Sequence, residues 1–348
     1  MKKILVGLSG GVDSAVTVYL LKKQGYHVTG LFLDMLEQNN DKEFKRVSIL
    51  AKQLQIELIR KDIRKIFQKE IIDKFTNSYK TGLTPNPCIV CNPKIKFKYL
   101  LQIADELGIK EVATGHYAII SENSNKSKVL LEGRDKNKDQ SYFLYRLAQK
   151  ELERSNFPLG RMLKEEVKEI AKKISLKIPK VESQDVCFLK NFKNLEEFLQ
   201  KQLNKKDFNK GAIVDGDGNI VGEHQGLLIY TLGQRKGLNI GGDGPFYVIG
   251  KDFEKNELLI SNVKQDKELL NKEIVIDDVI WTDKEPSKDN IYQIKIRYQM
   301  KSVNANIRKH SNTQWIVECS EAIWAVASGQ SLVVYNGNKV VGGGVITN

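Results

Sequence analysis

Short apolar runs alternate with longer segments of helical periodicity over the first third of this 348-residue chain. Apolar residues that recur every three or four positions indicate a helix, whereas compact β-branched runs indicate a buried strand. The resulting β-α-β-α order is typical of a parallel sheet that helices cover on both faces, and such a sheet binds ligands at the carboxyl ends of its strands. The expected strands are residues 3–8, 28–33, 56–59 and 111–114, and the expected helices are residues 14–23, 42–54 and 95–107.

The pattern is mixed between residues 120 and 210. Residues 129–131 indicate a strand, and residues 141–147, 164–173 and 195–203 indicate helices. Residues 161–210 contain 13 Lys and Arg but only 8 Asp and Glu, so this stretch is suited to follow a phosphate backbone. A solvated helix face explains any single one of these lysines at least as well.

After about residue 210 the runs become short, β-branched and separated by turn residues. Asn336-Gly337 between two valine-rich runs is a hairpin signal, and the tail as a whole predicts a small barrel that follows a compact β module over residues 211–265. Further strands are expected at residues 273–281, 292–298, 304–308 and 315–319. We therefore predict an α/β domain with a parallel sheet over residues 1–205, a small β-rich central domain over residues 206–268 and a C-terminal β-barrel over residues 269–348.

The composition is that of a globular protein, with 41% hydrophobic and 28% charged residues, and it excludes a disordered, collagen-like or disulfide-framed chain. The net charge of +12 favours a polyanionic partner, either nucleic acid or an anionic membrane surface. A lysine-rich proteome explains the same surplus, so charge alone leaves the two explanations even.

No apolar stretch approaches the roughly 20 residues that cross a bilayer, and the apolar run after Met1 is too short for a signal peptide. We therefore expect a cytoplasmic protein with no membrane partner. In that reducing compartment the four cysteines are buried thiols, metal ligands or reactive groups. They are Cys88, Cys91, Cys187 and Cys319.

The string GLSGGVDS, residues 7–14, stands where the first strand gives way to the first helix. Two adjacent glycines let the backbone approach a phosphate, Ser9 and Ser14 add hydroxyl donors, and Asp13 is suited to hold a Mg²⁺ ion. The lysine of an ordinary P-loop and the glycine pattern of a dinucleotide fold are both absent. The whole string is far more specific than a bare glycine turn, and it is typical of enzymes that split ATP between its α and β phosphates.

A second string, ATGHY, ends a later strand at the same edge of the predicted sheet. Gly115 allows close approach to the nucleotide. His116 either donates to a phosphate or base or is a satisfied core residue, and its position favours the first role.

The cysteines give a third signal. Cys91 lies in a proline-pinned loop before the helix at residues 95–107, and a thiol near a helix N-terminus has a lowered pKa. Cys187 lies in the short extended segment SQDVCF. One C-x-x-C is half of a zinc site, and nothing in the sequence completes it. Cys319 is interpreted as an inert core thiol of a barrel strand.

The strings SGGVDS, TPNPxxxCN, ATGHY, KDQSYFL, SQDVCF and TLGQRKGL occur in this order. Together they resemble the bacterial tRNA-specific 2-thiouridylases of the PP-loop ATP pyrophosphatase superfamily, over essentially the whole chain. The resemblance implies an adenine nucleotide α-hydrolase-like fold and an ATP-dependent tRNA-uridine 2-sulfurtransferase. In that family ATP adenylates the C2 carbonyl oxygen of the wobble uridine, U34, and sulfur then displaces AMP to give 2-thiouridine, with pyrophosphate as the other product.

The resemblance also implies roles for single residues. Cys187 carries the sulfur as a persulfide, and Cys91 attacks that persulfide and ends in a Cys91–Cys187 disulfide, or assists sulfur release. The sulfur comes from a relay protein or a cysteine desulfurase, and the tRNAs have Lys, Glu and Gln anticodons. The implied nucleotide-binding residues are Gly7, Leu8, Ser9, Gly10, Gly11, Val12, Asp13, Ser14, Leu33 and Gly115. The implied tRNA-binding residues are Asn86, Pro87, Cys88, His116, Lys138, Asp139, Gln140, Arg297, Tyr298 and Gln330.

Cys88 departs from the family pattern, because other members often have Asp at this position. Cys88, Cys91 and Cys187 with an open fourth position form a candidate iron–sulfur site, although the persulfide route is the preferred reading. Two other classes of function remain open. One is an amide ligase that shares the ATP loop and needs no paired cysteines, and the other is a tRNA-binding protein whose ATP loop is a relic.

Overall fold

The computed structural model describes residues 1–37, 40–176, 186–238, 240–241 and 244–347. The residues Ser183, Gln184 and Asp185, which begin the SQDVCF string, lie outside the described residues. So do parts of the glycine turn at residues 241–244.

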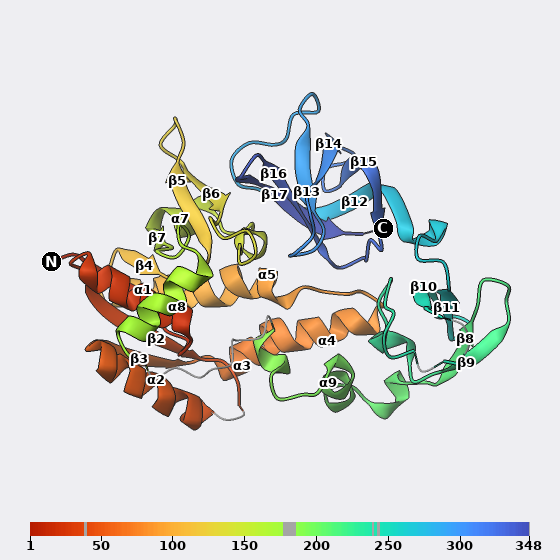
Figure 1. Ribbon diagram of the computed structural model, residues 1–348, viewed down its shortest axis with the longest axis horizontal. Coiled ribbons are helices and arrows are strands. Elements are labelled where there is room, and N and C mark those ends of the chain that lie inside the picture. Colours follow the sequence, from red (N-terminus) through yellow and green to blue (C-terminus); the bar gives the residue numbers. More distant parts are fainter. Residues whose placement is uncertain (38–39, 177–185, 239, 242–243, 348) are drawn as a thin grey trace.

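A parallel sheet forms the centre of the N-terminal part (Figure 1). Its strands are β1 (Lys3–Gly7), β2 (His27–Asp34), β3 (Glu57–Asp62), β4 (Glu111–Ala113) and β7 (Ser155–Asn156), and its helices are α1 (Val12–Lys23), α2 (Asn40–Leu54) and α6 (Lys98–Glu106). In the described chain the strand order is β3-β2-β1-β4-β7, and every neighbouring pair is parallel. Ile4 and Val6 pack against α1 and α2 on one face, whereas Leu5 packs against α6 on the other. This alternation along β1 confirms the prediction that helices cover both faces.

One long helical segment ends in α6 on the second face of this sheet. It runs through α5 (Pro87–Cys91), a π-helical turn η2 (Asn92–Phe97) and then α6. Pro93 has no N–H with which to reach the carbonyl four residues earlier, and the helix widens there to i→i+5 hydrogen bonding. The segment packs on an apolar cluster that includes the aromatic residues Phe75, Phe188 and Phe198.

The elements of that cluster come from three stretches of sequence. They are α3 (Arg64–Phe67), η1 (Gln68–Ile72), α4 (Asp73–Lys80), the 3₁₀ turn η4 (Cys187–Leu189) and α9 (Leu195–Gln202). Two further helices, α7 (Gln149–Arg154) and α8 (Lys164–Lys173), belong to the sheet's outer layer, where α8 packs beside α1 (Figure 1).

The C-terminal part is a closed barrel, as the sequence predicts. Its strands are β12 (Leu270–Trp281), β13 (Tyr292–Lys295), β14 (Val303–Lys309), β15 (Trp315–Trp324), β16 (Ser331–Asn336) and β17 (Lys339–Ile346). In this part of the described chain β12 pairs with both β15 and β17, which closes the sheet on itself. A hairpin from the first half, β5 (Ala118–Glu122) and β6 (Lys128–Glu132), joins the outside of β17, an arrangement that the sequence did not predict.

The predicted helix over residues 141–147 is wrong. Only a 3₁₀ turn, η3 (Ser141–Phe143), forms there. Tyr142, Leu144 and Tyr145 are all fully buried between the β5–β6 hairpin and the barrel, and Tyr142 donates a 2.7 Å hydrogen bond to the carbonyl of Ser331. Burial on several sides replaces the single apolar face that a surface helix needs.

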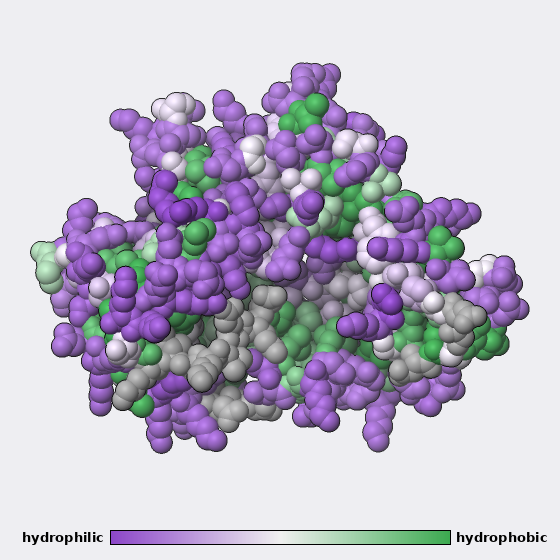
Figure 2. Space-filling model, in the orientation of Figure 1, coloured by the Kyte–Doolittle hydropathy of each residue, from purple (hydrophilic) through white to green (hydrophobic). Residues whose placement is uncertain are grey.

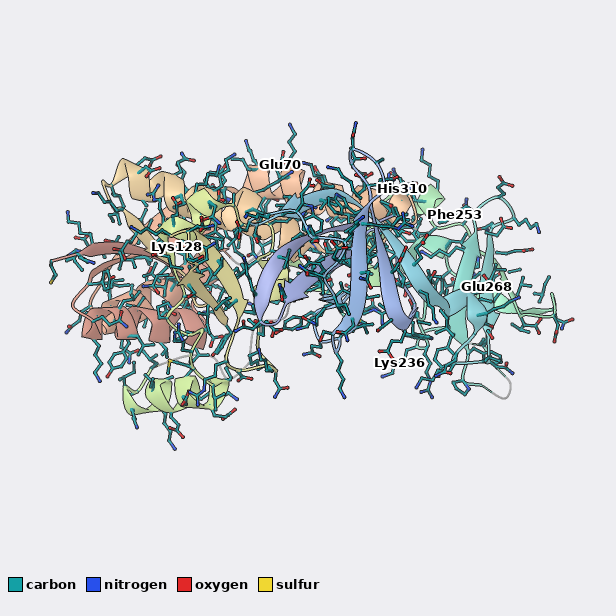
Figure 3. All side chains as sticks on the ribbon, turned by 90° about the horizontal axis from the view of Figure 1, so that it is seen from above. Glu70, Lys128, Lys236, Phe253, Glu268 and His310 are labelled. Carbon is teal, nitrogen blue, oxygen red and sulfur yellow. The ribbon has the colours of Figure 1, made fainter. Side chains whose placement is uncertain are left out.

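The segment that lies between these two parts in sequence forms a small sheet of order β10-β11-β8-β9 at one end of the molecule (Figure 1). Its strands are β8 (Gly211–Val214), β9 (Ile220–His224), β10 (Tyr247–Asp252) and β11 (Glu257–Ser261), around a core that includes Ile213, Val248 and Ile260. Figure 3 places Lys236 and Phe253 at this end of the molecule, opposite the end that holds Lys128 of β6.

Candidate active site

A cavity of about 960 Å³ opens at the carboxyl ends of β1, β2 and β4. Its wall brings together most of the residues that the sequence singled out, from segments far apart in the chain. They are Gly7, Leu8, Ser9, Gly10, Gly11, Val12, Asp13, Ser14, Leu33, Pro87, Cys88, Cys91, Gly115, His116, Lys138, Gln140, Cys187 and Tyr298. A second cavity, of about 490 Å³ beside Arg154 and Arg161, holds none of the predicted site residues.

The GLSGGVDS loop is braced by its own serines. The hydroxyl of Ser14 donates to the carbonyl of Gly11 at 3.1 Å and lies 3.3 Å from the amide of Ser9. Gly10 has φ +80°, a conformation that residues with a side chain rarely adopt, and a Cβ there would lie 2.9 Å from Val47. The loop therefore requires glycine at this position to make its turn into α1.

Gly115 brings the end of β4 against this loop. A Cβ on Gly115 would lie 2.9 Å from the backbone carbon of Asp13 and from the backbone nitrogen of Ser14. Any larger residue must push the start of α1 away, because backbone atoms cannot rotate aside as a side chain does. The glycine at this position thus allows the end of β4 to lie directly against the start of α1.

Asp13 points toward α8. Its two carboxylate oxygens accept hydrogen bonds from Nζ of Lys164 at 2.7 and 2.8 Å, and the hydroxyl of Tyr117 donates to the same carboxylate at 2.7 Å. A carboxylate that is already paired with a lysine does not present a magnesium site, and no group of three candidate ligands gathers in the described residues.

The cysteine side of the cavity is apolar. Cys91 is buried at 4% exposure, and Cys187 packs against the same cluster of Phe67, Phe75 and Phe188. Burial raises the pKa of Cys91 to about 12 and also raises the pKa of Cys187, which favours the neutral thiol. The prediction of a lowered pKa for Cys91 is wrong, because burial of the thiol raises its pKa by more than the nearby helix N-terminus lowers it.

Lys96 is a cation that sequence reasoning missed. The π-helical turn makes i→i+5 hydrogen bonds, so residues five apart lie above one another, and this places Lys96 over Cys91. Burial lowers the pKa of Lys96, but the charges of Cys91, Cys88 and Cys187 raise it by more. Lys96 in turn opposes the rise in pKa of Cys91 and Cys187. A proline two residues after a C-x-x-C, in a helical pattern, was the signal that could have shown this placement.

His116 is held as a neutral side chain. Its Nδ1 lies 2.7 Å from the hydroxyl of Thr114, and its ring packs against those of Phe97 and Phe157. Burial lowers its pKa to about 3, and the charge of Lys96 adds to the effect. The ring faces the cavity, so it serves there as a neutral hydrogen-bonding group.

The other predicted RNA contacts divide into two groups. Lys138, Gln140 and Tyr298 line the cavity, where Tyr298 packs on the ring of Phe143 at 4.6 Å between centroids. Asn86 lies just outside it and caps α5 by accepting from the amide of Cys88 at 3.2 Å.

Three further predicted contacts make hydrogen bonds within the protein. Asp139 is 5% exposed and accepts hydrogen bonds from Gly133 and Ser141. Arg297 donates to the carbonyls of Trp324 and Ala325 within the barrel. Gln330 donates to the carbonyl of Thr84 at 2.7 Å, which ties the barrel to the loop before α5.

All four cysteines are free thiols. Cys88, Cys91 and Cys187 share the cavity, but within the described ranges they do not form a set that could hold a metal, and burial favours their neutral state. These residues do not fit an iron–sulfur cluster. Cys319 lies in β15 of the barrel core, away from the cavity.

Comparisons with known proteins cover the whole chain. Residues 2–191 match the family described as tRNA methyl transferase HUP domain, residues 196–262 the tRNA methyl transferase PRC-barrel domain, and residues 271–346 the aminomethyltransferase beta-barrel domain. The tRNA-specific 2-thiouridylase MnmA of Neisseria meningitidis serogroup A is 40% identical over 352 residues, covering 99% of this chain and 95% of the relative. That of Escherichia coli strain SMS-3-5 is 38% identical over 360 residues, covering 99% and 96%.

The chain belongs to the tRNA-specific 2-thiouridylase family. A solved 4-thiouridine synthetase–RNA complex with bound ATP aligns with 50% of this chain and 41% of its own at a TM-score of 0.34 and 18% identity, too low to bear on function. Within the described residues, no helix of this thiouridylase family member is both long and apolar enough to cross a membrane.

Proposed function

We propose that this chain is a tRNA-uridine 2-sulfurtransferase that converts the wobble uridine U34 of tRNA to 2-thiouridine at the expense of ATP. One observation carries the proposal: a single cavity wall holds both the GLSGGVDS loop and the cysteines Cys91 and Cys187. An amide ligase has no use for paired thiols beside its nucleotide loop.

The first step activates an oxygen. A ring carbonyl oxygen is a very poor leaving group until it is esterified to phosphate. The C2 oxygen of the uracil forms a bond to the α-phosphorus of ATP, and the bond from that phosphorus to the bridging oxygen breaks, so its electron pair leaves with pyrophosphate. The N3 proton of the uracil passes to solvent in this step and is regained when 2-thiouridine forms. The loop and Gly115 hold the phosphates through closely approaching backbone, and Leu33 lies where the adenine side is expected.

The second step delivers sulfur. The terminal sulfur of a Cys187 persulfide attacks C2, and AMP leaves with the original oxygen. The Cys91 thiolate then attacks Sγ of Cys187, and the sulfur–sulfur electron pair passes to the new C2–sulfur bond. The products are 2-thiouridine and a Cys91–Cys187 disulfide, which an external thiol must reduce before the next turnover. That disulfide requires the two Cα atoms to come within ~7 Å.

The RNA contacts follow from which side chains face the cavity. We assign Lys138, Gln140 and Tyr298 to the nucleotides around the target base, where lysine meets phosphate and tyrosine stacks on an unpaired base. His116 donates or accepts as a neutral ring, and Asn86, Pro87 and Cys88 approach the target base. Three further predicted contacts act by holding these surfaces in place, namely Asp139, Arg297 and Gln330.

The partners follow from the chemistry. A persulfide-bearing relay protein or a cysteine desulfurase supplies the sulfur, and the substrates are tRNAs with Lys, Glu and Gln anticodons. The protein acts in the cytoplasm, where these tRNAs are modified.

The purified chain tests the proposal directly. We would incubate it with a cysteine desulfurase, cysteine, ATP and an unmodified transcript that carries U34, and analyse the RNA by mass spectrometry. We expect 2-thiouridine at position 34 with AMP and pyrophosphate as the nucleotide products, and no sulfur in a matched transcript with C34. Formation of ADP and phosphate, or an unmodified U34 transcript, would contradict it.

A further inference from the structure

The GLSGGVDS loop contains no lysine or arginine to bind phosphate, but cationic side chains from other parts of the fold lie beside it. Lys164, from α8, lies 151 residues from Asp13 in sequence, yet its Nζ lies at 2.7 and 2.8 Å from the carboxylate oxygens of that residue. Its side chain is only 7% exposed, whereas that of Asp13 is 32% exposed at the cavity wall. The pair therefore stands at the edge of an open site and not inside a core.

Lys164 is the first of three lysines on one face of α8. Lys164, Lys168 and Lys172 are spaced by four residues, so they lie along one face of α8, and all three line the cavity. Val167 and Ala171 pack against Val16 of α1, which fixes this face relative to the loop. Figure 1 shows α8 alongside α1, and Figure 2 shows hydrophilic side chains over this half of the molecule.

A second cation stands on the other side of the loop. Nη2 and Nε of Arg46, from α2, lie 3.2 and 3.3 Å from the position that a Cβ on Gly10 would take. Within the described residues, that buried Nε has no hydrogen-bond partner. An unpaired buried donor is costly, and an anion at Gly10 would satisfy it. Arg46 and Lys164 thus bracket the loop.

We propose that Lys164 and Arg46 are the ligands of the pyrophosphate portion of ATP, and that Lys164 moves from Asp13 to the phosphates when the nucleotide enters. The inference rests on the proposed function in that ATP is the substrate and pyrophosphate its leaving group. A polyphosphate carries more charge than one carboxylate, so it competes successfully for the lysine. The negative charge of the departing pyrophosphate is then neutralised by these two cations.

Binding measurements test the assignment in the full-length protein without any RNA. The probes are pyrophosphate, the uncleavable α,β-methylene analogue of ATP, and AMP, titrated by calorimetry in buffer free of divalent cations. Lys164→Gln should weaken pyrophosphate and the analogue roughly 10- to 100-fold and AMP less than about 3-fold, because one charge-assisted contact is lost. Lys173→Gln removes the same charge from α8 outside the cavity wall and should change none of the three.

Asp13→Asn separates direct binding from loop positioning. If Lys164 binds phosphate directly, releasing it from Asp13 should leave pyrophosphate affinity unchanged or tighten it by roughly 3-fold. If Lys164 only holds Asp13, then Asp13→Asn and Lys164→Gln should weaken binding alike, and the inference fails. Lys164→Arg should retain affinity within about 5-fold.

Arg46→Gln keeps the test decisive if Lys164→Gln does not fold, and it should show the same selective loss. Equal affinity for pyrophosphate in the wild type, Lys164→Gln and Arg46→Gln would overturn the inference while leaving the proposed function intact. A wild type that binds none of the probes would count against both. Selective loss in a protein that fails to thiolate tRNA would support the phosphate ligands and refute the proposed function alone.

Discussion

The two ends of the cavity, the GLSGGVDS loop and the cysteines, differ in how far their side chains are already in the state that the reaction needs. At the loop end, glycines, serine hydroxyls and the side chains of Lys164 and Arg46 already lie in place for an anion. At the cysteine end, the thiols of Cys91 and Cys187 lie among aromatic rings, with pKa values that burial has raised. Activation of the oxygen can therefore begin as soon as ATP and RNA are bound, whereas the sulfur chemistry starts from protonated thiols that must first lose a proton.

This contrast has a chemical purpose. A reactive thiolate beside an open nucleotide site would be oxidised or alkylated between turnovers. Holding both thiols neutral until sulfur and RNA arrive protects them, and Lys96 stands ready to stabilise the anion once one forms.

The largest effect is expected from the thiols themselves. Cys187→Ser and Cys91→Ser should each lower 2-thiouridine formation by about 10³-fold or more, because a hydroxyl neither carries sulfur nor closes a disulfide. Binding of the α,β-methylene ATP analogue should stay within about 2-fold, since the loop end is untouched. Cys319→Ser, in the barrel, is the matched control and should thiolate normally. Full turnover in both site variants would contradict sulfur transfer through Cys91 and Cys187.

Gly115→Ala should damage the opposite end. The added Cβ lies 2.9 Å from backbone atoms of Asp13 and Ser14, and such overpacking costs about 1–3 kcal/mol. We expect affinity for the ATP analogue to fall by roughly 5- to 100-fold, while alkylation of Cys187 by iodoacetamide proceeds at the wild-type rate. Gly216→Ala, where a Cβ meets nothing, is the control. Slower alkylation in Gly115→Ala would mean that the two ends are not independent.

Lys96→Gln should affect only the thiols. Without this cation the pKa of Cys187 rises further, so less thiolate exists at pH 8 and alkylation slows by roughly 3- to 10-fold. Lys96→Arg should restore the rate, and Lys94→Gln, an exposed lysine on the same turn, should leave it unchanged. Peptide mass spectrometry reads each cysteine separately. An unchanged rate in Lys96→Gln would show that the cation does not act on the sulfur.

The smallest effect concerns His116. Its pKa in the folded protein is lowered to about 3, below the ordinary value of 6.5, so the unfolded chain binds more protons between these values. The contribution of His116 to the free energy of unfolding is therefore fully present above about pH 6.5. It declines as the pH falls, by roughly 1–2 kcal/mol at pH 5.

The melting temperature reports this decline. From pH 7 to pH 5 it should fall further for the wild type than for His116→Asn, whereas His310→Asn, an exposed histidine of the barrel (Figure 3), should follow the wild type. Identical slopes in all three proteins would show that His116 is not held neutral.

The loop end was accessible to sequence reasoning because its signals are local. A strand, two glycines and a helix within residues 3–23 specify one turn, and the alternation along β1 predicts both covered faces. The barrel followed from the turn pairs and β-branched runs after residue 210 for the same reason.

The environment of the cysteines was not accessible, because it is made by tertiary packing. The cluster that buries Cys91 joins Phe67 and Phe75 to Phe188, which lies far away in the sequence. The approach of Lys164 to Asp13, and the attachment of the β5–β6 hairpin to β17, likewise join residues more than 150 positions apart. No periodicity within a window of the sequence reports such contacts.

The fate of one oxygen atom tests the central claim, that the uracil oxygen is activated by ATP and then displaced by sulfur at the same site. A tRNA labelled with oxygen-18 at C2 of U34 would be thiolated by the wild-type protein, and the nucleotide products analysed by mass spectrometry. The account predicts that the label appears in the phosphate of AMP, in equal amount to the 2-thiouridine formed. Label released into water or found in pyrophosphate would contradict it.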